Sequence, residues 1–403
     1  MPGDQPDYAK MLTPVREMPT RTIEVIGRPP ELPHMTNRET EEYRALRDTI
    51  RERGTARHWV IVVGLTTWAA LTLGTLAFGS YEALLLPGLY RALYGALYPT
   101  RFALPSSAAF AAACGLAPHP VEELIGFHIA FGKTVPDVSL NAVANLGYAE
   151  LRFHRPVTTG TTIRTSSEVI GLKENSNGKT GVVYVRSTAV DEAGDTLIDW
   201  ARWVMVNKRD HDAPAPEPVV PDLAAVVAPE DLVVPAGLDF SAYDLAAAGE
   251  PHRWGDYEVG EKIDHVDGVT LTDPEHMLAT RLWQNTAKVH FNTEVRPDGR
   301  RLIYGGHIIS MARALSFNGL ANAQLIAAIN AGAHTAPAFA DDTVYAWSEV
   351  LDKAEVDAPG VGALRLRLVA TKGRDEAMVL KGDDGKYAPG VLLDLDLWAL
   401  CPR

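Results

Sequence analysis

Two features that lie close together in this sequence could act on a carbonyl group. His290 stands between two apolar residues, and a histidine can accept or donate a proton near neutral pH. Gly305 and Gly306 then open an apolar run, with His307 directly after them. Backbone amides at a helix start can hold a negatively charged oxygen, so the pattern indicates acid–base chemistry on a carbonyl or thioester. Taken alone, the same residues also fit a core histidine and an ordinary glycine turn.

The elements that would position these residues occur twice along the chain. Asp199 and Trp203 recur as Asp394 and Trp398. At a second constant offset, Pro156, Thr162, Ser167, Glu168 and Val169 recur as Pro337, Thr343, Ser348, Glu349 and Val350. Each copy is predicted to hold one helix, opened by Gly132 or by Gly305-Gly306, and then a run of antiparallel strands. The strands of the first copy are predicted at 149–153, 162–170, 182–190 and 196–206, where β-branched residues dominate. The predicted fold class is α+β, with each helix wrapped by a curved sheet and the two copies covering each other's sheet edges.

Composition shifts divide the chain into four predicted parts. Residues 1–88 form an atypical N-terminal segment, 89–208 the first unit, 209–250 a proline-rich extended linker, and 251–403 the second unit. The segment 59–80 has no charged residue and follows several arginines, so it is predicted to be an apolar helix. Its length fits a membrane span and equally a helix packed on the first unit. The segment 59–80 lies close to residues 76–90, where the first unit is expected to have its opening strand.

Composition and charge exclude several classes of protein. The net charge is −13, which argues against a nucleic-acid partner and against an anionic membrane surface. Two cysteines, Cys114 and Cys401, form no disulfide framework and favour a cytoplasmic setting. The sequence has no metal-ligand cluster, no phosphate-binding glycine loop and no dinucleotide fingerprint, so no metal and no cofactor are expected.

Four stretches of the sequence resemble one enzyme family. They are QNTAKVHFN at 284–292, YGGH at 304–307, FHIAFGKTVPDVSLN at 127–141 and GLKENSNGKTG at 171–181. They are similar to the mesaconyl-CoA hydratases, also called β-methylmalyl-CoA dehydratases, among the MaoC-like enzymes with a double hot-dog fold. The resemblance covers roughly residues 89–403. It implies a hydro-lyase that adds water reversibly to a branched enoyl-CoA thioester, and a chain that assembles into a homo-oligomer.

The resemblance also implies roles for individual residues, with one departure from the family motif. The motif histidine falls on His290, but the motif aspartate falls on Asn285, which can position a water and cannot act as a base. In the first copy the corresponding positions are Thr100 and Pro105, so the second copy is predicted to be catalytic and the first to support the substrate. Possible replacements for the missing acid are Asp273, Glu275 and His276.

The implied reaction places negative charge on the thioester oxygen, and the free carboxylate of the substrate needs a cation. The backbone amides of Gly305, Gly306 and His307 are the predicted oxyanion and thioester site. Lys288 and Arg301 are the candidate carboxylate partners, with Arg300 beside them. Two other interpretations of the function remain open at this point. One is a different hot-dog hydratase or thioesterase, and the other is a non-catalytic CoA-ester-binding protein tethered to a membrane through residues 59–80.

Overall fold

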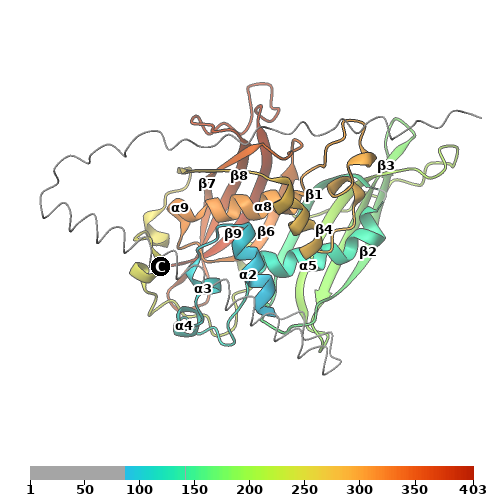
Figure 1. Ribbon diagram of the computed structural model, residues 1–403. Helices are drawn as coiled ribbons and strands as arrows, with labels where there is room; N and C mark the ends of the chain where they lie inside the picture. The colour runs from blue at the N-terminus through green and yellow to red at the C-terminus, as the bar shows by residue number, and fades with distance from the viewer. Residues whose placement is uncertain (1–86, 141) are drawn as a thin grey trace, which may run out of the picture. The chain divides into compact units, whose positions relative to one another are not determined.

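The computed structural model describes residues 87–140 and 142–403, which build one antiparallel sheet of nine strands (Figure 1). The strand order is β2-β3-β4-β1-β6-β9-β8-β7-β5. The strands are β1 (Ala142–Phe153), β2 (Arg164–Glu174), β3 (Thr180–Val190), β4 (Thr196–Asn207), β5 (Lys262–Thr270), β6 (Leu325–His334), β7 (Thr343–Glu355), β8 (Val361–Lys372) and β9 (Val391–Pro402). Strands β1 to β4 come from the first copy of the repeat and β5 to β9 from the second. The copies join where β1 pairs with β6, and each copy thereby covers one edge of the other.

One long helix from each copy packs on the sheet. Helices α5 (Glu123–Thr134) and α8 (Gly305–Leu315) run across the same face of the sheet in Figure 1. His128 Nε2 and Ser310 Oγ lie 2.7 Å apart and join the two helices. The other helices are α2 (Pro87–Leu97), α3 (Ala103–Ser106), α4 (Ala108–Ala113), α6 (Leu245–Ala248), α7 (Asp273–Leu282) and α9 (Phe317–Leu320). In the part of the chain that the structure describes, no helix combines the length and the apolar character that a bilayer span requires.

The prediction that Gly132 opens the first helix is wrong. The helix begins at Glu123, and Gly132 lies in its last turn. A Cβ at Gly132 would lie 1.8 Å from the carbonyl oxygen of Trp283, so the glycine is needed where α5 meets the second copy. After α5 the chain forms a π-helical turn, η3 (Val135–Ser139), and then enters β1.

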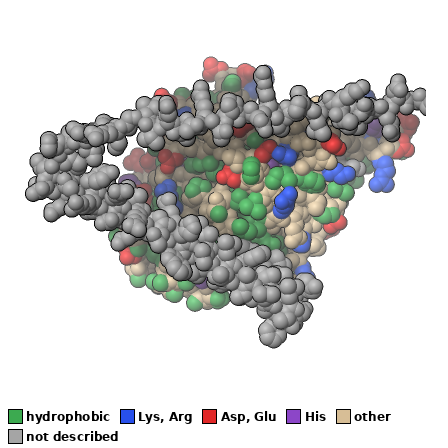
Figure 2. All heavy atoms as spheres, in the orientation of Figure 1, with side chains coloured by type: hydrophobic (Ala, Val, Ile, Leu, Met, Phe, Trp, Pro, Cys, Tyr) green, Lys and Arg blue, Asp and Glu red, His purple; other side chains and the backbone are tan. Residues whose placement is uncertain are grey.

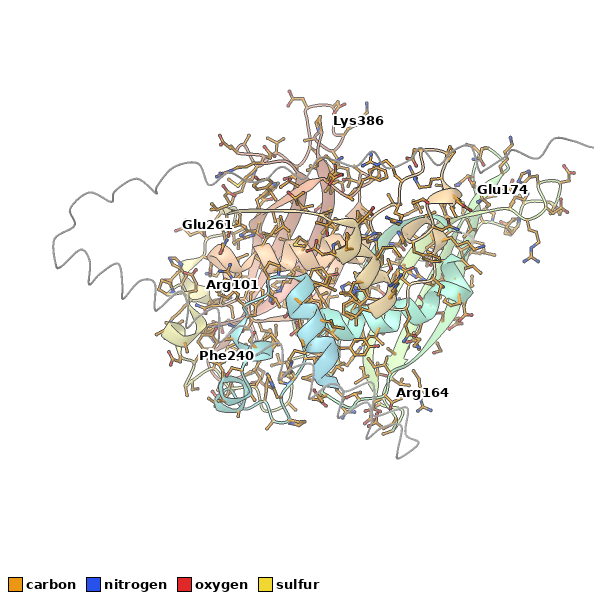
Figure 3. The ribbon with its side chains drawn as sticks, viewed as in Figure 1. Arg101, Arg164, Glu174, Phe240, Glu261 and Lys386 are labelled. Atoms are coloured by element: carbon orange, nitrogen blue, oxygen red, sulfur yellow. The ribbon has the colours of Figure 1, made fainter. Side chains whose placement is uncertain are left out.

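The beginning of the predicted first unit packs on the second copy. The rings of Tyr94 and Trp283 lie 5.9 Å apart. Arg101, which is labelled in Figure 3, donates a 2.8 Å hydrogen bond from Nη2 to Asn318 Oδ1. Residues 87–97 are helical, so the expected opening strand does not extend over them. The rest of that predicted strand and the predicted apolar helix 59–80 lie outside the described residues.

The proline-rich segment 209–250 was predicted to be an extended linker, but it contains the short helix α6 and is bound to the sheet over part of its length. The Val227 amide donates to Asn330 Oδ1 at 2.9 Å, and the Val227 carbonyl accepts from Trp398 Nε1 at 3.0 Å. Phe240 and Tyr243 are buried in the same apolar cluster as Trp398. The segment therefore covers one part of the core, which a free linker would not do.

Candidate active site

A cavity of about 320 Å³ lies where the two copies meet. The first copy contributes residues from α5, η3, β1 and β4, and the second contributes the loop before α8 and the end of β6. Apolar side chains form most of its wall. The polar side chains in the wall are Ser139, Asn145, Tyr148, Arg202, Asn285, His290, Tyr304, His334 and Thr335. Such a cavity, apolar with a few convergent polar groups, has the character of a small-molecule site.

His290 is held in one orientation at the cavity wall. It ends a short 3₁₀ turn, η6 (Lys288–His290), and its Nδ1 lies 2.8 Å from the carbonyl oxygen of Leu302. Because a carbonyl only accepts, Nδ1 carries the hydrogen and Nε2 keeps a lone pair. Burial lowers the pKa of His290 below its ordinary 6.5, although the bond to Leu302 opposes the shift. The imidazole is therefore neutral near pH 7, and Nε2 can accept a proton.

The start of α8 borders the same cavity at Gly305. Tyr304 is the N-cap residue and makes no side-chain cap, so the first amides of the helix point outward without a capping oxygen. Of the three predicted oxyanion residues, Gly305 lines the cavity, whereas Gly306 and His307 do not. The His307 amide already donates to the Tyr304 carbonyl at 2.9 Å. The Gly305 amide is thus the donor that the cavity wall offers to a developing oxyanion, and the Gly306 amide follows it in the first turn of the helix.

Asn285 also lines the cavity and is almost fully buried. Its Oδ1 accepts a hydrogen bond from the Ala287 amide at 3.0 Å, which turns the loop toward His290. The Asn285 side-chain nitrogen is left as a donor that can hold a water or a substrate oxygen. No aspartate or glutamate lines the cavity within the described chain, and the carbonyl oxygen of Leu302 is the group that orients His290.

Behind the cavity wall, a group of buried histidines fixes the start of α8. His276 Nε2 accepts from the Tyr304 amide at 2.9 Å, and Tyr98 Oη lies 2.9 Å from His307 Nδ1. Burial lowers the pKa of His276 to about 3 and that of His307 to about 4, so both rings are neutral. They act as hydrogen-bonding core residues that position Tyr304 and the helix.

The family model described as mesaconyl-CoA hydratase matches residues 107–384. This chain belongs to the mesaconyl-CoA hydratase family. A relative from Cereibacter sphaeroides named mesaconyl-CoA hydratase is 69% identical, over 78% of this chain and 91% of the relative. A relative from Chloroflexus aurantiacus named β-methylmalyl-CoA dehydratase is 57% identical, over 77% of this chain and 90% of its own length.

Solved structures agree with the family and with the fold. A MaoC domain dehydratase from Chloroflexus aurantiacus superimposes with a TM-score of 0.76 at 57% identity, over 78% of this chain and 91% of that one. A Mycobacterium tuberculosis protein described as a double hotdog fold gives a TM-score of 0.62 at 26% identity, over 77% of this chain and 91% of that one. The predicted double hot-dog fold and the family resemblance are confirmed.

The cations that the sequence suggested for this hydratase-family site lie outside the cavity. Lys288 is exposed, and Arg301 Nη2 lies 2.5 Å from Asp273 Oδ2 in an ion pair at the surface. Neither residue lines the cavity. Arg300 stacks on the Phe339 ring at 4.0 Å and does not line it either.

The suggested replacements for the motif acid are also engaged elsewhere. Asp273 is occupied by Arg301, and Glu275 accepts from Thr272 Oγ1 at 2.8 Å at the start of α7. His276 is buried behind Tyr304, as described above. None of these three residues lines the cavity.

Among the polar cavity residues that sequence reasoning missed are Tyr148, Arg202 and His334. Tyr148 and Arg202 are direct cross-strand neighbours on β1 and β4, and His334 ends β6. One signal for Arg202 was present in the sequence. It interrupts an otherwise apolar strand that reads Trp200, Ala201, Arg202, Trp203, Val204.

Proposed function

We propose that this protein catalyses the reversible addition of water to mesaconyl-CoA, with β-methylmalyl-CoA as the product. The observation that carries the proposal is the neutral, oriented His290 in an apolar cavity that also borders the open start of α8. Membership of the mesaconyl-CoA hydratase family and the names of two relatives support the choice of substrate.

In the proposed reaction, the thioester oxygen lies at the amides of Gly305 and Gly306. Those amides and the positive end of the α8 dipole stabilise the enolate-like charge that develops on this oxygen. Asn285 holds the attacking water through its side-chain amide. His290 Nε2 takes one proton from this water while the oxygen bonds to Cβ, and the imidazolium then gives the proton to Cα. One water is consumed, and dehydration follows the same steps in reverse.

The test is a direct assay of the full-length chain with mesaconyl-CoA. Hydration removes the double bond conjugated to the thioester, so the ultraviolet absorbance of the enoyl-thioester should fall and the hydroxyacyl-CoA should appear by mass spectrometry. Release of free CoA without hydration would favour a thioesterase. Tight binding of mesaconyl-CoA with no turnover would favour a non-catalytic CoA-ester-binding protein. Either result would overturn the proposed function.

We also propose that the protein works in the cytoplasm as a homo-oligomer and has no nucleic-acid partner. Acidic and basic side chains are interspersed among hydrophobic ones on the visible part of the face in Figure 2, and the net charge is −13. At the sheet edge, Val169 on β2 and Val219 and Val220 beside it are more than half exposed, which suits a contact between copies. Light scattering of the purified protein tests the assembly. Detergent-free recovery after lysis tests the alternative of a membrane contact through 59–80, which carbonate-resistant pelleting would favour.

A further inference from the structure

Arg202 is a fully buried cation whose side chain is only partly paired. It lies on β4, lines the cavity and has 0% of its surface exposed. Its Nη2 donates a 2.7 Å hydrogen bond to Thr134 Oγ1, and the guanidinium stacks on the Phe131 ring at 4.3 Å. Nε and Nη1 are buried and have no hydrogen-bond partner, and no carboxylate of the described residues forms an ion pair with Arg202.

A buried charge without a counter-ion is costly, and other buried cations of a fold normally have partners. Arg313 illustrates the usual solution in this chain. Its Nη2 donates to the carbonyl oxygens of Ala323 and Gln324, and the carboxyl groups of Glu122 and Glu123 raise its pKa against the effect of burial. The hydroxyl of Thr134 is the one hydrogen-bond partner of the Arg202 side chain among the described residues. Burial lowers the pKa of Arg202 to about 10, so the side chain remains a cation at neutral pH.

The fold itself does not require an arginine at this position. Trp203 and Trp398 are equivalent in the internal repeat, so Arg202 corresponds to Leu397 in the second copy. Leu397 is buried in the apolar core. At this position the first copy therefore has a charged side chain where the second copy has a hydrocarbon side chain. The charged side chain lines the cavity.

We propose that Arg202 binds the free carboxylate of the acyl group and thereby selects a dicarboxylic acyl-CoA over a neutral enoyl-CoA. The inference rests on the proposed function, because mesaconyl-CoA is the substrate that carries such a carboxylate. Arg202 is the only lysine or arginine among the described residues that line the cavity. In this proposal the acyl group lies between the amide of Gly305 and the guanidinium of Arg202, in the cavity that His290 also lines.

Thr134 is a positioning residue in this arrangement. Its hydroxyl donates to the Phe131 carbonyl at 2.7 Å, so its oxygen presents a lone pair to Arg202 Nη2. Thr134 ends α5 directly before the π-helical turn η3, whose residues Val135 and Ser139 line the cavity. Single π-turns of this kind often occur at functional sites. Here the turn η3 directly follows Thr134, the residue that accepts the hydrogen bond from the guanidinium.

The experiment compares two substrates in Arg202→Leu, which introduces the residue of the second copy. The substrates are mesaconyl-CoA and the analogue in which a methyl group replaces the free carboxylate. Loss of a charge-assisted contact should lower kcat/KM for mesaconyl-CoA by roughly 10²–10³-fold. The value for the analogue should stay within a few-fold or rise. Arg202→Lys keeps the charge and should retain part of the preference, and Thr134→Val should shift the preference in the same direction by less.

The melting temperature separates this role from a structural one. Removal of a partly paired buried charge should leave the melting temperature of Arg202→Leu unchanged or raise it, whereas loss of a structural contact would lower it. Arg374→Gln removes a guanidinium that is paired with Asp264 outside the cavity, and it should change neither substrate preference nor turnover.

Three results would overturn the assignment. They are an equal loss on both substrates in Arg202→Leu, an intact preference for mesaconyl-CoA in that variant, and a collapse of the preference in Arg301→Gln. The wild type is measured first, because this separates the two proposals. A wild type that hydrates the analogue and not mesaconyl-CoA refutes the proposed function together with the role of Arg202. A wild type that prefers mesaconyl-CoA, with the preference intact in Arg202→Leu, refutes the role of Arg202 alone.

Discussion

Replacing His290 by glutamine should separate its chemical role from its structural one. Glutamine is neutral and close to histidine in volume, but its amide nitrogen takes the position of Nε2; the hydrogen bond from His290 Nδ1 to the Leu302 carbonyl at 2.8 Å is reproduced by asparagine, so His290→Asn is made beside it. Neither amide can take a proton from water near neutral pH. We therefore expect kcat for mesaconyl-CoA to fall by about 10²–10⁴-fold, the usual range for a general acid–base group, in a protein that folds normally.

The alanine variant adds a structural cost to the same chemical loss. His290→Ala leaves the Leu302 carbonyl without its donor at the cavity wall, which costs about 1–3 kcal/mol for an unsatisfied buried acceptor. His290→Ala should therefore melt below His290→Asn while both show equally low turnover. A matched control is His265→Gln. His265 is fully buried and bonded to Asn318 O at 2.7 Å and Ser348 Oγ at 2.8 Å, outside the cavity. This control should lose stability and keep its kcat.

The pH dependence of the wild type supplies a second measure of His290. A general base works when unprotonated, so activity is present above its pKa and is lost as the pH falls through that pKa. Burial lowers the pKa of His290 below 6.5. The acid limb of kcat/KM should therefore lie below pH 6.5, and it should disappear in His290→Gln. A folded His290→Gln protein with wild-type turnover, measured by loss of enoyl-thioester absorbance, would remove His290 from the mechanism.

Three further outcomes follow from the geometry. Gly306→Val should reduce both affinity and turnover for mesaconyl-CoA. A Cβ at residue 306 would lie 2.5 Å from the ring of Tyr304, which lines the cavity. Unchanged KM and kcat would contradict this prediction. Asn285→Asp should raise KM for mesaconyl-CoA more than for the analogue that lacks the carboxylate, and initial rates on the two substrates check this. The free energy of unfolding should decrease as the pH falls from 6.5 toward 4. In this range the histidines of the unfolded chain take up protons, whereas the same histidines stay neutral when they are buried in the folded protein. A melting temperature that stays constant from pH 7.5 to 5 would refute this. Burial lowers the pKa of five histidines to about 3 or 4, namely His128, His265, His276, His307 and His334.

Local sequence patterns predicted the strands well and one helix start badly. The four predicted strands of the first copy correspond to β1 to β4, although β1 begins at Ala142 and not at the predicted residue 149. The start of α5 was placed at Gly132 because a glycine in an apolar run resembles the glycine pair that opens α8. The actual reason for Gly132 is its approach to the Trp283 carbonyl, which is far away in the chain. A contact of this kind leaves no local signal.

Contacts between distant parts of the chain also explain which site residues could be predicted from the sequence and which could not. His290, Asn285 and Gly305 lie within a short stretch of chain, so their spacing could suggest a shared site, and all three line the cavity. The carboxylate partners Lys288 and Arg301 were chosen for the same nearness along the chain. The cavity, however, is closed by strands of the other copy through the β1–β6 pairing. Arg202 could be recognised as an unexpected charge within a largely apolar strand, but its place in the same cavity as the start of α8 depends on that long-range pairing.

The exchange of the motif aspartate for Asn285 follows from the charge of the proposed substrate. A carboxylate at residue 285 would stand in the wall of the same buried cavity as the substrate carboxylate. At an assumed separation of about 6 Å and an effective dielectric constant of about 20, two like charges repel by about 3 kcal/mol, roughly a hundredfold in affinity. Asn285 avoids this repulsion and still holds water, while the Leu302 carbonyl orients His290 without adding a charge. The described cavity wall then carries one cation, Arg202, and no anion of its own, so a bound dicarboxylic acyl group would balance it.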